Sequence, residues 1–294
     1  MPEQTLQMLF YVVFLGQVLL VSFYLPRVIL GRVTHVIERY PPSRYPKLYP
    51  GPLETAQRAL RIYRNLNFVV LLIGLAMVLT SVFLLPLERM RAWQEMTDFA
   101  SYEFILTAYF LLQFSPMLIS VAFGLPYFNL KRRAGSRTKR RAQLSRRRLS
   151  DFVSPSLFGL AIGAYITFIA FITYVRQFEF PWFGGYLNVA ILTGVNLFFL
   201  GIAIRQVYGK KKDPYQAYED RMRQIEFSMR ALLLVSIGVT VYTMLGITLK
   251  AFGMDSLTPI FTSVYYQLLA VVSFREFRID DVNFEVYRED PVAA

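Results

Sequence analysis

The chain offers few residues that could carry out acid–base, nucleophilic or redox chemistry. It has no Cys and a single His among 294 residues. This excludes thiolate nucleophiles, disulfides, cysteine-held metal sites and cages of several imidazoles. An interfacial enzyme that modifies lipids would have to use groups such as His35, Glu38 or Asp98. His35 lies among Arg32, Glu38 and Arg39, where an ordinary solvated histidine is the simpler interpretation. We therefore assign no catalytic residue, no metal and no cofactor from the sequence.

Neutral polar side chains within apolar stretches could instead recognise a solute. The usual role of such a group in a membrane is an interhelical hydrogen bond worth about 0.5–1 kcal/mol. The functional alternative is a water-filled path for a small neutral solute. Its candidate residues are Gln17, Gln113, Ser115, Pro116, Asn188, Asn196, Thr240, Tyr242, Tyr265 and Gln267. Gln113-x-Ser-Pro116 is the strongest candidate, because proline frees a backbone carbonyl one turn earlier and bends the helix.

The elements that carry these residues are too apolar for one aqueous core. Hydrophobic residues make up 55% of the chain, and the mean hydropathy is +0.39. Seven stretches contain no Lys, Arg, Asp or Glu, and each is close to or above the ~20 residues that a helix needs to cross a bilayer. They are 7–26, 65–86, 104–130, 152–175, 183–204, 231–249 and 257–274. Because a charge at the bilayer centre costs a few kcal/mol, this pattern predicts an all-α polytopic transmembrane helix bundle of about seven spans.

The last of these stretches is the shortest and opens with Thr258-Pro259. A tight helical hairpin is the favoured interpretation, and a re-entrant segment is the alternative. Residues 1–274 are then a single transmembrane bundle. The first span is expected to be a retained helix, because no basic segment precedes it and no small-residue cleavage site follows.

The basic residues alternate between connections and so predict an orientation. Connections 27–64, 131–151 and 205–230, with the tail 275–294, hold 28 of the 32 Lys and Arg residues. The remaining four are Arg89, Arg91, Arg176 and Lys250. By the positive-inside rule the N-terminus is outside and the C-terminus inside, in a cytoplasmic (inner) membrane of the bacterial kind.

Connection 131–151 is the most basic part of the chain, with ten Lys or Arg residues and one acid. We expect contacts with anionic lipid or a membrane partner from Lys131, Arg132, Arg133, Lys139, Arg140, Arg141, Arg146, Arg147 and Arg148. Nucleic acid is a poorer match, because no aromatic residue lies between Leu130 and Asp151 to stack on bases. The tail 275–294 carries six acids against three arginines, so it should attract this loop weakly.

Two further patterns concern the shape of the protein and its assembly. Five prolines occur in residues 39–52, which excludes a helix and favours an extended polyproline II segment that lies at the interface or docks on a partner. Small residues such as Gly159-x-x-x-Gly163 allow close helix packing, within a compact bundle or in a homo-oligomer.

Together these patterns favour a non-enzymatic multi-pass membrane protein, a component, scaffold or sensor that contacts partners or anionic lipid through its basic cytoplasmic loops. An uncoupled facilitator or channel for a small solute is the alternative, and an interfacial lipid-modifying enzyme is the third. Ion-coupled transport is disfavoured, because no Asp, Glu or His lies at mid-membrane.

Overall fold

The computed structural model describes residues 3–83, 102–134, 148–176, 185–209, 211, 213–274 and 281–288. This part of the chain is helical and contains no strand. Six of its helices are long and apolar enough to cross a membrane: Gln4–Arg39, Leu53–Phe83, Pro155–Arg176, Tyr186–Tyr208, Tyr218–Ala251 and Asp255–Phe274. The protein is therefore a multi-pass helical membrane protein.

Each uncharged stretch lies largely within a helix, and several helices continue well beyond it. The helices are α1 (Glu3–Leu19), α2 (Leu25–Arg39), α3 (Leu53–Phe83), α5 (Tyr102–Ala134), α6 (Pro155–Arg176), α7 (Tyr186–Tyr208), α8 (Tyr218–Ala251) and α9 (Thr258–Phe274). The 34 residues of α8 extend over about 51 Å, against ~30 Å of hydrocarbon. The uncharged stretch thus marks the part of a helix that suits hydrocarbon, while the charged turns continue the helix outside it.

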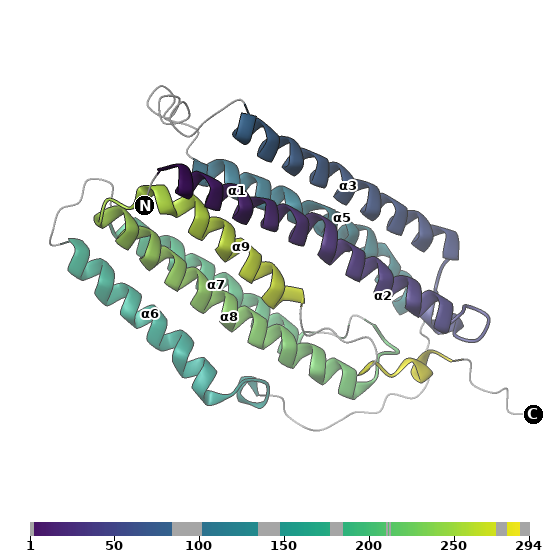
Figure 1. Cartoon of the computed structure of the whole chain (residues 1–294). Helices are drawn as coiled ribbons and strands as arrows, with labels where there is room; N and C mark the ends of the chain where they lie inside the picture. The colour runs from purple at the N-terminus through teal and green to yellow at the C-terminus, as the bar shows by residue number, and fades with distance from the viewer. Residues whose placement is uncertain are drawn as a thin grey trace, which may run out of the picture.

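The helices form two neighbouring groups within one bundle (Figure 1). In one group α1 packs against α3 and α9, and α5 packs against the same two helices. In the other group α6 and α7 both pack against α8. The groups meet where α8 contacts α9, and α9 follows α8 after a turn at Gly253, whose φ of 67° suits glycine.

One end of the bundle collects the connections that the sequence shows to be basic. There α2, α5 and α7 finish, α3, α6 and α8 begin, and the short helix η6 (Phe284–Tyr287) lies beside them (Figure 1). We refer to this end, where Arg39, Lys131, Arg148 and Arg205 lie, as the basic end.

A widened helical turn joins α1 to α2, so that the two form one continuous helix. Residues Leu20–Tyr24 form a π-helical turn, and the Leu25 N–H donates to the Leu20 carbonyl. Pro26 explains this turn, since its ring would clash with the carbonyl of Ser22 in a regular α-helix. The π turn relieves the clash and leaves Ser22 buried inside the bundle.

The proline-rich segment is compact, so the prediction of an extended segment was wrong. The N–H groups of Arg44 and Tyr45 both donate to the Pro41 carbonyl, and Pro46–Leu48 form a 3-10 turn. The Tyr49 hydroxyl donates to the Tyr40 carbonyl at 2.8 Å. The prolines exclude an α-helix from 41–45, but these tyrosine contacts fold the chain back on itself.

In the first group, neighbouring helices approach Gly74 of α3 closely. A Cβ atom at Gly74 would overlap the Tyr109 hydroxyl of α5, and it would lie 2.6 Å from Tyr109 Cζ and 2.8 Å from Val18 Cγ1. Glycine is therefore required for α1, α3 and α5 to meet here. By contrast, a Cβ atom at the exposed Gly163 of α6 would meet no atom within 4 Å.

Replacement of Gly74 by Ala should destabilise the protein by about 1–3 kcal/mol, because the added methyl group overpacks the contact with Tyr109 and Val18. Gly163→Ala is the matched control, and it should leave stability unchanged or slightly raised. Thermal unfolding in detergent measures both. Equal midpoints for the two variants would contradict the close packing at Gly74.

Candidate functional site

Two polar clusters stand out in the described chain, one inside the bundle and one at the basic end. The inner cluster centres on Gln17 of α1 and Gln113 of α5, which are 0% and 4% exposed. Gln17 Nε2 donates to Gln113 Oε1 at 2.9 Å, and Ser263 Oγ of α9 donates to Gln17 Oε1 at 2.7 Å. Three helices are thus joined through two buried amides.

The same chain of bonds continues from Gln113 to α3. Gln113 Nε2 donates to Ser22 Oγ in the π turn at 3.0 Å. Ser22 Oγ lies 3.4 Å from the Tyr109 hydroxyl, which itself donates to the Val70 carbonyl at 3.2 Å. Since the phenol proton is used on Val70, Ser22 is the donor to Tyr109. The bonds therefore run in one direction from Ser263 to the backbone of α3.

This cluster, which we call the glutamine chain, is suited to holding helices together. Its members are neutral amides, hydroxyls and a phenol, so they provide neither a charge for ion binding nor an acid–base pair. Interhelical bonds of this kind average about 0.6 kcal/mol each in membranes. Together they favour one arrangement of α1, α3, α5 and α9.

Within α5, the Ser115 hydroxyl replaces a backbone hydrogen bond that Pro116 cannot make. Proline at 116 removes the N–H that would bond the Leu112 carbonyl. Ser115 Oγ donates to that carbonyl at 2.7 Å. Ser115 thus satisfies the carbonyl freed by its neighbour, whereas Gln113 enters the glutamine chain, so the members of the Gln-x-Ser-Pro motif have separate roles.

The other predicted path residues lie in separate groups. Gln267 is near the glutamine chain and donates to the Val13 carbonyl at 3.0 Å. Tyr242 and Tyr265 stack with ring centroids 4.3 Å apart, where α8 meets α9. Asn196 accepts from Ser236 between α7 and α8, and Thr240 donates to the Ser236 carbonyl.

Asn188 lies in the first turn of α7, where its N–H donates to the Gly185 carbonyl. The structure therefore brings Gln17 and Gln113 together and pairs Tyr242 with Tyr265. It does not gather the predicted residues around one centre. A solute path through them stays a prediction.

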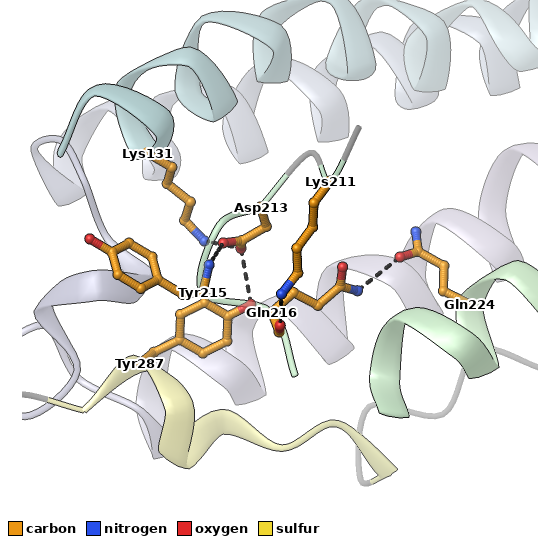
Figure 2. A network of polar contacts seen from close by, with 7 residues as sticks. All are labelled: Lys131, Lys211, Asp213, Tyr215, Gln216, Gln224 and Tyr287. Atoms are coloured by element: carbon orange, nitrogen blue, oxygen red, sulfur yellow. Dashed lines mark hydrogen bonds and ion pairs between the residues drawn. The ribbon is translucent and has the colours of Figure 1, made fainter. Parts of the chain in front are cut away.

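The cluster at the basic end is built on a buried ion pair. Lys131 Nζ lies 2.8 Å from Asp213 Oδ2, and Lys131 is 3% exposed (Figure 2). The same Oδ2 accepts from the Tyr287 hydroxyl at 3.0 Å, and Oδ1 accepts from the Tyr215 N–H at 2.9 Å. The Lys131 ammonium also lies 4.7 Å from the centre of the Tyr287 ring. Burial of this pair is tolerated because the carboxylate has several donors.

Neighbouring contacts tie this ion pair to α8. Lys211 Nζ donates to the Gln216 carbonyl, and Gln216 Nε2 donates to Gln224 Oε1 at 2.9 Å (Figure 2). The Arg221 guanidinium of α8 donates to the Gly209 carbonyl at the end of α7. The 213–216 turn is thereby fixed between α7 and α8.

Residues 281–288, which we call the C-terminal strap, cover this ion pair. The Asn283 N–H donates to Asp220 Oδ2 at 3.0 Å, and Phe284 stacks on Tyr40 with ring centroids 4.2 Å apart. The Tyr45 hydroxyl donates to Glu285 Oε1 at 2.9 Å. The strap therefore contacts the 40–49 segment as well as Lys131 and α8.

The contact between Tyr45 and Glu285 depends on a proton. The hydrogen bond to the Glu285 carboxylate is the main cause that raises the pKa of the Tyr45 phenol, because the bond exists only while the phenol is protonated. The contact is complete below the ordinary tyrosine pKa of about 10 and is lost as the pH rises through the raised value.

The predicted lipid-contact residues are not all exposed, and not all of them lie in the described part of the chain. Lys131 is buried and paired with Asp213, whereas Arg148 is exposed. Arg132 and Arg133 belong to α5, and nothing is described of their side chains. Lys139, Arg140, Arg141, Arg146, Arg147 and Asp98 lie outside the described residues.

His35 and Glu38 are exposed on α2. The described residues contain no group of three or more His, Asp or Glu side chains that could hold a metal ion.

Sequence reasoning missed Ser22, Tyr109, Ser263, Asp213 and Tyr287. Ser22 alone had a local signal, since it lies four residues before Pro26. The other residues meet partners far away in the chain.

Comparisons of the chain with protein-family models, with curated proteins and with solved structures found no match. Its function is therefore inferred from its own residues.

Replacement of Gln113 by Leu should destabilise the protein by about 1–2 kcal/mol, because Gln17 and Ser22 lose their partner inside the bundle. Thr173→Val is the control, since the exposed Thr173 hydroxyl donates to the Ile169 carbonyl of its own helix. That control should change stability by less than about 0.5 kcal/mol. A Gln113→Leu protein as stable as the control in detergent would show that the glutamine chain does not hold the helices.

Replacement of Asp213 by Asn should cost about 3–5 kcal/mol, because it leaves the buried Lys131 ammonium without its counter-charge. The control is Glu226→Gln, which breaks the Arg230–Glu226 pair, whose side chains are 50% and 42% exposed. An exposed pair is worth under ~1 kcal/mol. Unfolding midpoints that fall equally in both variants would refute the special role of the buried pair.

Proposed function

We propose that the protein is a non-enzymatic integral membrane component, scaffold or sensor that contacts anionic lipid or a membrane partner through its basic connections. In this proposal the chain crosses a bacterial-type inner membrane about seven times, with the N-terminus outside and the basic end in the cytoplasm. Six apolar helices support a multi-pass protein, and the segregation of basic residues supports the orientation.

The observation that carries the proposal is the contrast between the two polar regions. Inside the bundle, the polar side chains of the glutamine chain are used on one another and on the backbone. At and near the basic end, many arginines are exposed. They are Arg27, Arg39, Arg44, Arg58, Arg61, Arg64, Arg148 and Arg205. Each basic residue beside an anionic leaflet attracts it by about 1 kcal/mol.

The helices also provide a surface on which such contacts can form. The segment from Arg27 to Arg39 continues the first helix by about 18 Å beyond its apolar part, and the first turns of α3 and α8 continue similarly. In the proposed orientation, the arginines on these extensions lie at the depth of the headgroups and beyond them. A guanidinium group binds phosphate in two-pronged geometry, which suits a phospholipid headgroup.

The residues with catalytic potential give less support to an enzyme. His35 and Glu38 are exposed on α2, outside both polar clusters. The proposal therefore rests on binding through the basic end, and a polar path for solutes would depend on residues that the structure distributes among several helix pairs.

We expect the combined substitutions Lys139→Gln, Arg140→Gln, Arg146→Gln and Arg147→Gln to weaken binding of phosphatidylglycerol. At about 1 kcal/mol per basic residue, the four changes together should lower affinity by a factor of one hundred or more at low salt, and by less at high salt. Titration of short-chain phosphatidylglycerol and phosphatidylcholine into the detergent-solubilised protein, followed by native mass spectrometry, measures the preference.

The matched control replaces Arg89, Arg91, Arg176 and Lys250 by Gln, which removes the same number of charges from the other connections. It should retain the preference for phosphatidylglycerol. An equal loss in both variants would overturn the assignment of the binding surface. Solute flux in vesicles without any lipid preference would favour an uncoupled facilitator instead.

A further inference from the structure

The C-terminal strap and the start of the most basic connection share one carboxylate. Lys131 is the first basic residue after α5 leaves its apolar part, and nine further basic residues follow before Asp151. Asp213 Oδ2 binds both Lys131 Nζ and the Tyr287 hydroxyl (Figure 2). The position of the strap and the position of Lys131 therefore depend on the same oxygen atom.

The strap is bound at several points along its length. Asn283 is held by Asp220, Phe284 by Tyr40, and Tyr287 by Asp213 and Lys131. Tyr287 is the most buried of the strap residues. Because its ring covers the Lys131 ammonium while its hydroxyl bonds the counter-ion, Tyr287 is the principal anchor.

The strap also brings negative charge to a positive surface. The tail 275–294 has six acids and three arginines, and the side chains of Asp281 and Glu285 are exposed beside the basic end. Such charges lower the positive potential that an approaching anionic headgroup meets, and the effect is local because it decays over about 10 Å at 0.1 M salt.

We propose that the C-terminal strap is an autoinhibitory latch, which docks through Tyr287 and weakens the binding of anionic phospholipid to the basic end. This inference rests on the proposed function, and it adds its regulation. With the strap docked, Lys131 is buried, and Asp281 and Glu285 oppose the headgroup. With the strap released, these two acids leave the surface and Lys131 loses the Tyr287 ring that covers it. By linkage, anionic lipid in turn favours release of the strap.

The test uses the full-length protein in detergent with two separate readouts. Hydrogen–deuterium exchange of the 281–288 backbone reports docking, since the Asn283 N–H donates to Asp220 of α8. The Glu285 and Arg288 N–H groups are bonded within the strap and report its local structure. The affinity for short-chain phosphatidylglycerol reports inhibition. The variant is Tyr287→Ala, and Val286→Ala is the control, because it changes the neighbouring side chain and keeps the phenol.

In Tyr287→Ala we expect faster exchange across 281–288 and a phosphatidylglycerol affinity raised about fivefold or more, at the lower end of ordinary couplings between sites. Val286→Ala should match the wild type in both readouts. Tyr287→Phe keeps the ring over Lys131 but loses the bond to Asp213, so it should give intermediate values. This milder variant tests the latch if Tyr287→Ala does not fold.

The outcomes separate the latch from the proposed function. Exchange in the wild type as fast as in Tyr287→Ala would show that the strap is not docked, and would overturn the latch. Faster exchange with an unchanged or lower affinity, in a protein that prefers phosphatidylglycerol, would also overturn it. If wild type and variant both fail to distinguish phosphatidylglycerol from phosphatidylcholine, the proposed function itself fails, and the inhibitory role fails with it.

Discussion

Hydrocarbon provides no hydrogen-bond partner, so a polar side chain inside a bilayer must find its partner on the protein. This constraint explains which helices are neighbours here. Polar pairs join α1 to α5, α6 to α7, α7 to α8 and α8 to α9: Gln17–Gln113, Tyr165–Thr193, Asn196–Ser236 and Tyr242–Thr262. Because each pair links two different helices, satisfying the polar groups also selects one packing arrangement over others that would bury the same apolar area. The bundle is thereby specified as well as stabilised.

At the basic end the same constraint applies to ionised groups, since a buried charge must also find its partners on the protein. Burying Lys131 without a counter-charge would cost several kcal/mol, and Asp213 can lie beside it only because other donors complete its coordination. One of those donors is Tyr287, which lies 74 residues from Asp213 in the chain. The connections at the basic end are therefore linked to one another by contacts that depend on the C-terminal strap, and exposed arginines surround them.

The sequence predicted those features that depend on the free energy of each residue by itself. Exclusion of charge from hydrocarbon acts on each residue separately, so the uncharged stretches lie largely within helices, six of which are long and apolar enough to cross a membrane. It was uninformative where the structure depends on distant residues. Nothing near Gln113 indicates Gln17 or Ser22 as partners, and nothing near Lys131 indicates Asp213. The proline-rich segment illustrates a third case. Prolines fix φ and exclude a helix, but they leave the path of the chain open, and here tyrosine hydrogen bonds and ring contacts select compact turns.

In the proposed topology, the chain crosses the membrane an odd number of times and its basic end lies in the cytoplasm. Because the chain has no Cys, a single cysteine introduced at residue 2 or at residue 293 is a unique label site. A membrane-impermeant maleimide applied to cells with an opened outer barrier should label residue 2 directly, and should label residue 293 only after the membrane is permeabilised. Labelling of both positions from the same side would contradict this topology, since such labelling requires an even number of crossings.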